Sequence, residues 1–163
     1  MITRYTNISL VLILGAFSTL VAVNNLTDYN SNFEFVKHVL SMDTTFPGNN
    51  AMYRAIHVEW AWHLAYALII AGEIITATLL CRGGIALWKS RHAAANDFNR
   101  AKRTAVAGLA TGFIVWFFGF TVIGGEWFLM WQSSKWNGLE AASRVYLAML
   151  VCLVYLNQYE TEK

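Results

Sequence analysis

One apolar stretch of this chain contains ionisable side chains at a spacing that could build a site. From Glu59, the residues His63, Tyr66 and Glu73 follow at offsets of 4, 7 and 14. A helix with 3.6 residues per turn places these positions on one face. Ionisable groups inside a membrane span are costly, and they usually face a bundle interior, a cavity or one another. This face is therefore the first candidate for function.

Depth in the membrane divides the candidate residues into two groups. With a rise of ~1.5 Å per residue, Glu73 lies about 15 Å further along the helix than His63. His57 and Glu59 are expected near the outer interface, where Glu126, at the outer end of the next apolar stretch, could meet them. The predicted cluster is His57, Glu59, His63, Tyr66 and Glu126, with Glu73 as a separate intramembrane carboxylate.

Three kinds of cofactor suit these side chains. A metal ion could use Glu59, His63 and Glu126, because carboxylates and imidazoles are ligands of zinc, iron or manganese. A haem could take His57 or His63 as an axial ligand. A quinone could accept a hydrogen bond from His63 or Tyr66. Against these stands the interpretation that Glu59 and His63 pair with each other or with nearby arginines. The absence of any cofactor is the leading expectation.

Four apolar stretches must position these residues, at about 8–23, 56–81, 104–123 and 143–158. A helix needs ~20 apolar residues to cross ~30 Å of hydrocarbon. Hydrophobic residues make up 56% of the chain and charged residues only 13%, against about 25% charged in soluble domains. The sequence predicts an all-α membrane protein in which residues 1–163 form one up-down bundle of four transmembrane helices.

The first outer loop carries a helical signal of its own. Ser31 and Glu34 have the spacing of a capping box, and Phe33, Val36 and Leu40 recur at helical intervals. We expect a short amphipathic helix that lies on the outer surface.

Basic residues indicate the orientation. The loop between the second and third stretches holds six of them: Arg82, Lys89, Arg91, Arg100, Lys102 and Arg103. Because Lys and Arg in short loops favour the cytoplasmic side, both termini are expected in the cytoplasm and the protein in a bacterial inner membrane. A net charge of +2 gives no reason to expect nucleic acid binding. The lipid bilayer, with bound lipids, is the expected surrounding.

Small and aromatic residues mark surfaces for contact. Gly108, Gly112 and Gly119 lie along one side of the third stretch, and small residues let helices approach closely in lipid. The contact could be within the chain, with another integral membrane subunit or with a second copy. Three tryptophans follow in the second outer loop: Trp127, Trp131 and Trp136. They suit an interfacial belt or a docking surface equally.

Three segments carry a family resemblance: residues 35–46, residues 66–73 and the Gly-Gly-Glu-Trp-Phe run within residues 119–138. In these segments the chain resembles the predicted small integral membrane proteins of Gram-negative bacteria, a family of unknown function. The resemblance implies a four-span inner-membrane protein. It brings no activity, cofactor or catalytic residue that could be transferred to this chain.

The expected function is that of a non-enzymatic accessory subunit in a larger membrane assembly, such as a respiratory or electron-transfer complex. No nucleophile–base pair, phosphate-binding loop or redox cysteine motif favours catalysis. One alternative is a redox subunit that binds quinone, haem or metal at the outer end of the second and third spans. A further alternative is a small proton- or ion-conducting protein that depends on Glu73.

Overall fold

Four long helical rods and one short helix across their end make up the computed structural model, which describes residues 1–161. Each rod is long and apolar enough to cross a membrane, which confirms the predicted bundle of four spans. The third rod runs from residue 95 to 127 because the charged residues that precede the apolar stretch are also helical. In chain order the elements are α1 (Ile2–Thr27), α2 (Tyr29–Ser41), η1 (Met52–Arg54), α3 (Glu59–Lys89), α4 (Ala95–Phe113), η2 (Ile114–Trp127), η3 (Met130–Gln132) and α5 (Leu139–Leu156).

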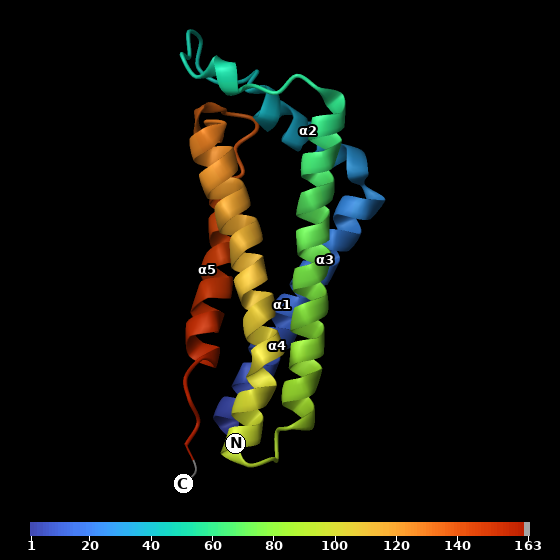
Figure 1. Ribbon diagram of the computed structural model, residues 1–163, viewed down its shortest axis with the longest axis vertical. Helices are drawn as coiled ribbons and strands as arrows, with labels where there is room; N and C mark the ends of the chain where they lie inside the picture. The colour runs from blue at the N-terminus through green and yellow to red at the C-terminus, as the bar shows by residue number, and fades with distance from the viewer. Residues whose placement is uncertain (162–163) are drawn as a thin grey trace.

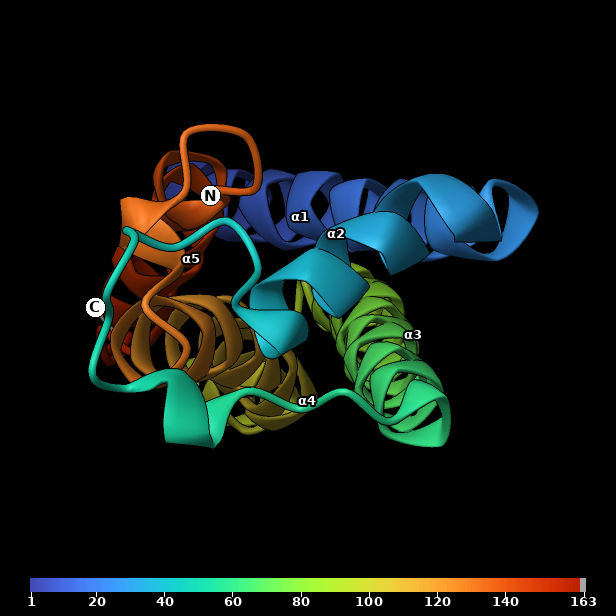
Figure 2. The same cartoon turned by 90° about the horizontal axis from the view of Figure 1, so that it is seen from above.

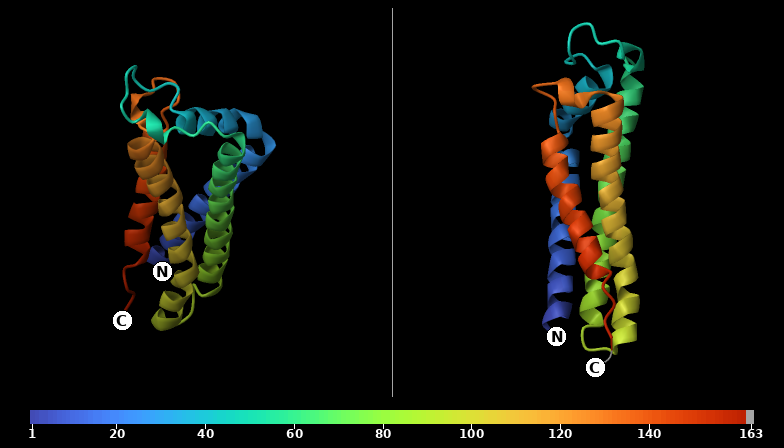
Figure 3. Two further views of the ribbon diagram at one scale, coloured as in Figure 1. Left: turned by 45° about the horizontal axis from the view of Figure 1, so that its top comes forward. Right: turned by 90° about the vertical axis from the view of Figure 1, so that its left-hand side faces the viewer.

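Successive rods run in opposite directions, so the bundle has two distinct ends (Figures 1 and 3). We call the end with α2, η1 and η3 the α2 end, and the opposite one the terminal end. At the terminal end, Arg4 Nη2 lies 2.8 Å from Glu160 Oε2. Arg4 Nη1 also donates to the Ala93 carbonyl oxygen at 2.7 Å. These contacts join the two ends of the described chain to the α3–α4 loop.

Helix α2 lies across the α2 end of the bundle, between α1 and α3 (Figure 2). The expectation of a short helix in this loop is confirmed. The predicted capping box is wrong, because α2 begins at Tyr29 and has no side-chain cap. The chain turns at Asp28 and resumes a helix at once, which places Ser31 inside the first turn. Glu34 instead pairs with Lys37 at 3.0 Å.

The glycines at the α3–α4 interface permit very close packing. A Cβ atom added to Gly83 would lie 2.6 Å from the backbone nitrogen of Ala105. One added to Gly108 would lie 3.0 Å from the Leu80 side chain, and one added to Gly112 would lie 3.0 Å from Cγ2 of Thr76. Gly108 and Gly112 therefore contact α3 of the same chain.

The second half of the third rod is a π-helix of 14 residues. Such i→i+5 helices are usually single-turn bulges, and they occur often at functional sites. The buried apolar core also divides near this segment. One cluster extends to the terminal end and includes Leu80, Leu109 and Trp116. The other lies at the α2 end and includes Val36 and Tyr66.

Candidate functional site

The intramembrane carboxylate of Glu73 has a hydrogen-bond partner on another helix. Glu73 is 2% exposed, and its Oε2 accepts a hydrogen bond of 2.7 Å from Asn25 Nδ2 near the end of α1. Asn25 is itself 6% exposed. A buried polar group is stable only when it is paired, so this bond explains how a carboxyl group is accommodated between α1 and α3.

Asn25 connects Glu73 to a polar side chain on α2 and to another on α3. Its Oδ1 accepts a hydrogen bond of 2.7 Å from Asn32 Nδ2 on α2. The Tyr66 hydroxyl donates to the same oxygen at 3.3 Å and to the Asn25 backbone oxygen at 3.2 Å. Tyr66 is 1% exposed. The amide of Asn25 is thus the centre of a network that joins α1, α2 and α3.

A second polar group lies next to this network, closer to the surface of the α2 end. The Tyr29 hydroxyl oxygen and His63 Nδ1 are 2.8 Å apart. His63 Nε2 lies 3.8 Å from Glu59 Oε1. Phe33 stacks on the His63 ring at a centroid distance of 4.2 Å, and the Tyr29 and Tyr66 rings are 4.6 Å apart. Aromatic packing therefore connects the exposed His63 to the buried Tyr66.

The network lines a cavity of about 340 Å³ beneath α2. Its polar wall holds Glu73, Asn25, Asn32 and Tyr66, together with the neighbouring Asn24. The opposite wall is apolar and comes from η2 and the first turns of α5. Its aromatic rings are those of Trp116 and Phe120 in η2. The cavity therefore offers hydrogen-bonding groups on one side and flat apolar surfaces on the other.

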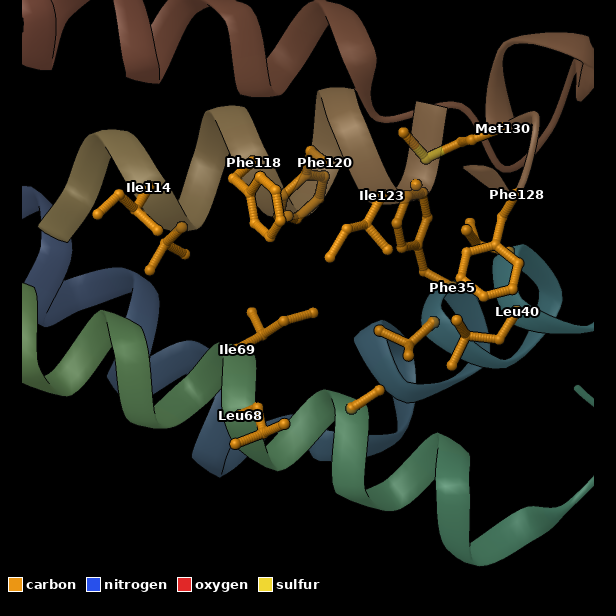
Figure 4. Close-up of a pocket in the computed structure, with 16 residues that line it drawn as sticks. Phe35, Leu40, Leu68, Ile69, Ile114, Phe118, Phe120, Ile123, Phe128 and Met130 are labelled. Atoms are coloured by element: carbon orange, nitrogen blue, oxygen red, sulfur yellow. The ribbon is translucent and has the colours of Figure 1, made fainter. Parts of the chain in front are cut away.

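An apolar groove of about 380 Å³ adjoins this cavity. Figure 4 shows Ile114, Phe118 and Ile123 of η2 facing Leu68 and Ile69 of α3 across an open space. The groove and the polar cavity share four lining residues, namely Phe35, Val36, Ile69 and Phe120. Each volume lies in the range of about 300–1,000 Å³ that is typical of ligand pockets.

Comparison with protein families finds one family model that matches almost the whole chain. The model of the predicted small integral membrane protein family, a domain of unknown function (DUF2165), matches residues 3–159. The chain belongs to this family. Comparison with curated proteins and with solved structures finds no match. Members of the family are integral membrane proteins, so lipid surrounds this chain, whereas its function has to be argued from the site.

The structure separates some of the residues that the sequence grouped together. Within residues 1–161, no three His, Cys, Asp or Glu residues lie close enough to hold a metal ion. Glu59 and His63 approach each other, but Glu126 is not brought to them, and the predicted metal centre is not assembled. His57 is exposed just before α3 begins. His63 and Tyr66 do lie at the candidate site, and Glu73 belongs to it rather than standing apart.

The three tryptophans Trp127, Trp131 and Trp136 pack against other residues of the α2 end, whereas Gly119 does not. The Arg54 guanidinium lies 4.6 Å from the centre of the Trp127 ring, and Trp131 packs edge-on against Phe46. Trp136 stacks on His38 with ring centres 4.6 Å apart. These contacts hold the segments of the α2 end together. Gly119 lines the apolar groove, where an added Cβ atom would meet nothing within 4 Å.

Sequence reasoning missed three residues of the site: Tyr29, Asn32 and Asn25. Asn25 lies beyond the apolar stretch 8–23, whereas α1 continues to Thr27 and keeps Asn25 buried. The available signal was the amide pair Asn24–Asn25 at the end of an otherwise apolar span. Polar residues there can pair with a carboxylate on the next span.

Proposed function

We propose that this protein is a non-enzymatic membrane protein that binds a quinone. The quinone ring occupies the polar cavity, and its apolar tail lies in the adjoining groove between α3 and η2. The observation that carries this proposal is the shared wall between a cavity with buried hydrogen-bonding groups and an apolar groove. A molecule with a polar head and an apolar tail matches that arrangement.

The chemistry of the walls favours a quinone head group. The amides of Asn24 and Asn25 can donate hydrogen bonds to carbonyl oxygens, because Asn25 Nδ2 has a second N–H besides the one that Glu73 accepts. Glu73 can also donate when it is protonated. Trp116 and Phe120 provide aromatic faces for a planar ring. The π-helical backbone of η2 supports the proposal further, because it forms the wall where the two spaces meet.

Quenching of tryptophan fluorescence by a short-chain benzoquinone tests the proposal. Trp116 lines the cavity, so bound quinone should quench it, and the saturable part of the quenching should disappear in Trp116→Phe. We expect Glu73→Leu to weaken binding by about fivefold to tenfold, because Leu neither donates nor accepts a hydrogen bond and one such bond contributes ~1 kcal/mol.

Two further variants separate binding from partition into detergent or lipid. Gly119→Leu places a side chain in the groove, where an added Cβ atom meets nothing within 4 Å, and it should abolish saturable quenching while the helical content stays unchanged. Val151→Leu, at an exposed position of α5, is the matched control and should bind as the unsubstituted protein does. Quenching that is linear in quinone and equal in every variant would contradict the proposal.

The role of accessory subunit remains a second proposal. With Gly108 and Gly112 packed inside the chain, its support is the exposed aromatic surface at the α2 end, where Trp60 is 68% and Trp127 51% exposed. Native mass spectrometry from the source membrane tests it, since a partner subunit would add protein mass. We also propose that the terminal end faces the cytoplasm, because Arg4, Arg91 and Lys102 gather there.

A further inference from the structure

Side chains that can carry protons lie one after another from the α2 end to Glu73, with a ring contact in place of a hydrogen bond between Tyr29 and Tyr66. The series begins with Glu59 and His63, which are both exposed, and continues through the hydrogen bond between His63 and Tyr29. The Tyr29 ring packs on Tyr66, whose hydroxyl reaches Asn25 beside Glu73. Each of these side chains except Asn25 can hold or pass a proton.

Towards the terminal end, Glu73 has no comparable neighbours. Beyond Glu73, the fully buried side chains on α3 are Thr76, Leu80 and Leu87, and Ala77 is buried as well. The Thr76 hydroxyl is committed to the Gly72 carbonyl oxygen at 2.8 Å. Val11 and Ile8 of α1 close the same region. Ser18 and Asn7 of α1 are also buried on this side, and neither the Ser18 hydroxyl nor Asn7 Oδ1 has a hydrogen-bond partner. Through the described residues, no chain of hydrogen bonds therefore leads from Glu73 to the terminal end.

We propose that Glu73 exchanges protons with the aqueous phase at the α2 end and not with the phase at the terminal end. Water in the polar cavity carries the proton past Asn25, since Asn24, Asn32 and Tyr66 supply the hydrogen-bonding partners that such water needs. His63 takes up a proton from solvent on one ring nitrogen and passes one from the other to the Tyr29 hydroxyl oxygen, which releases its own proton to water beside Tyr66. A proton leaves Glu73 by the reverse steps.

The charged surroundings of Glu73 are simple. Among the described residues that line its cavity, Glu73 and Tyr66 are the only two that titrate, and the walls from α1, α2, η2 and α5 add none. Asp28 at the α1–α2 turn, with Tyr29, His63 and Glu59, lies further out. This inference goes beyond quinone binding and does not require it, because a hydrated, ligand-free cavity is sufficient.

Labelling with dicyclohexylcarbodiimide tests the sidedness. This apolar reagent reacts with protonated carboxyl groups, and mass spectrometry of the peptide that contains Glu73 measures the product. The protein is reconstituted in phosphatidylethanolamine–phosphatidylglycerol vesicles, and the two orientations are separated by capture through the C-terminus. Lowering the pH on the α2 side by one unit should raise the initial labelling rate by up to about tenfold. The same change on the terminal side should leave the rate unchanged.

The path is tested by the speed of this response. Tyr29→Phe keeps the ring and its stacking but removes the hydroxyl, and it should slow the response to a pH jump by about tenfold, which corresponds to ~1.4 kcal/mol in the barrier. Tyr53→Phe changes an exposed tyrosine at the same end and should have no effect. If Tyr29→Phe does not fold, His63→Gln provides the same test. Glu73→Gln should give no labelled peptide.

Two results of these experiments would overturn the inference. Labelling that follows the pH on the terminal side, or an unaltered response in a folded Tyr29→Phe or His63→Gln variant, overturns the inference. Saturable quinone quenching is measured separately. Its loss with sided labelling intact would remove the proposed function and leave the proton path in place.

Discussion

The hydrogen bonds of Asn25 allow a sharp prediction for stability. Asn25→Ala removes the donor to Glu73 and the acceptor for both Asn32 and Tyr66. It leaves Glu73, which is 2% exposed, without that donor. Asn24→Ala is the matched control, because it makes the same change at an exposed position one residue earlier. We expect the first variant to be clearly less stable than the second.

The magnitude follows from the number of bonds lost. Hydrogen bonds between helices in membrane proteins contribute about 0.6 kcal/mol on average and about 1.7 kcal/mol at most. Three lost side-chain bonds therefore predict a loss of about 2–5 kcal/mol in the free energy of unfolding for Asn25→Ala. For Asn24→Ala the expected change is within about 0.5 kcal/mol. Asn25→Ala and Glu73→Ala combined should cost about 1 kcal/mol less than the sum of the two single changes.

Unfolding in mixed micelles with increasing dodecyl sulfate, followed by circular dichroism, provides these free energies. The inferred role of Asn25 is refuted if Asn25→Ala lowers the free energy of unfolding no more than Asn24→Ala does. It is also refuted if the Asn25 and Glu73 substitutions are strictly additive, since residues in direct contact should show a coupling energy.

Three further predictions follow from packing and surface contacts. A Leu side chain at position 83 has no room beside the Ala105 backbone, so Gly83→Leu should lower the free energy of unfolding by about 3 kcal/mol or prevent folding. Gly119→Leu should change it by less than about 0.5 kcal/mol. The same dodecyl sulfate titration measures both. Arg4→Ala breaks the contacts with Glu160 and Ala93, so limited proteolysis should cut the C-terminal segment faster while the helical content is kept. Trp136→Leu removes the stacking on His38, and hydrogen exchange should show faster exchange in α2 but not in α5.

Much of the fold could be predicted because long apolar stretches leave few alternatives in a membrane. Helices satisfy their own backbone hydrogen bonds, and short loops make neighbouring helices antiparallel. The π-helix of η2 could not be predicted from the sequence. The spacing of apolar side chains does not reveal whether each backbone N–H bonds to the carbonyl oxygen four or five residues before it. An i→i+5 helix winds more slowly than a 3.6-residue helix. The sequence therefore does not define the directions of the side chains near the end of η2, including Glu126.

The site was predictable only in part. The spacing from Glu59 to Glu73 identified the face of α3 that carries the ionisable residues. The partners come from elsewhere: Asn25 from the last turns of α1, and Asn32 and Tyr29 from a helix that turns back across the bundle. Tyr29 and Asn32 reach the site only because the chain turns at Asp28. Neither the cavity nor the groove has a sequence signature, because each is a space left between helices.

Photolabelling tests the central claim, quinone binding between α3 and η2, most directly. A short-chain quinone that carries a photoactivatable azide is bound to the protein in lipid and activated by light, and the labelled peptides are identified by mass spectrometry. We predict labels on the α3 and η2 residues that line the groove and cavity, such as Ile69 and Phe120, and loss of these labels when excess unlabelled quinone is present. Labels scattered over lipid-facing positions such as Val151 and Val154, with no competition, would contradict the account.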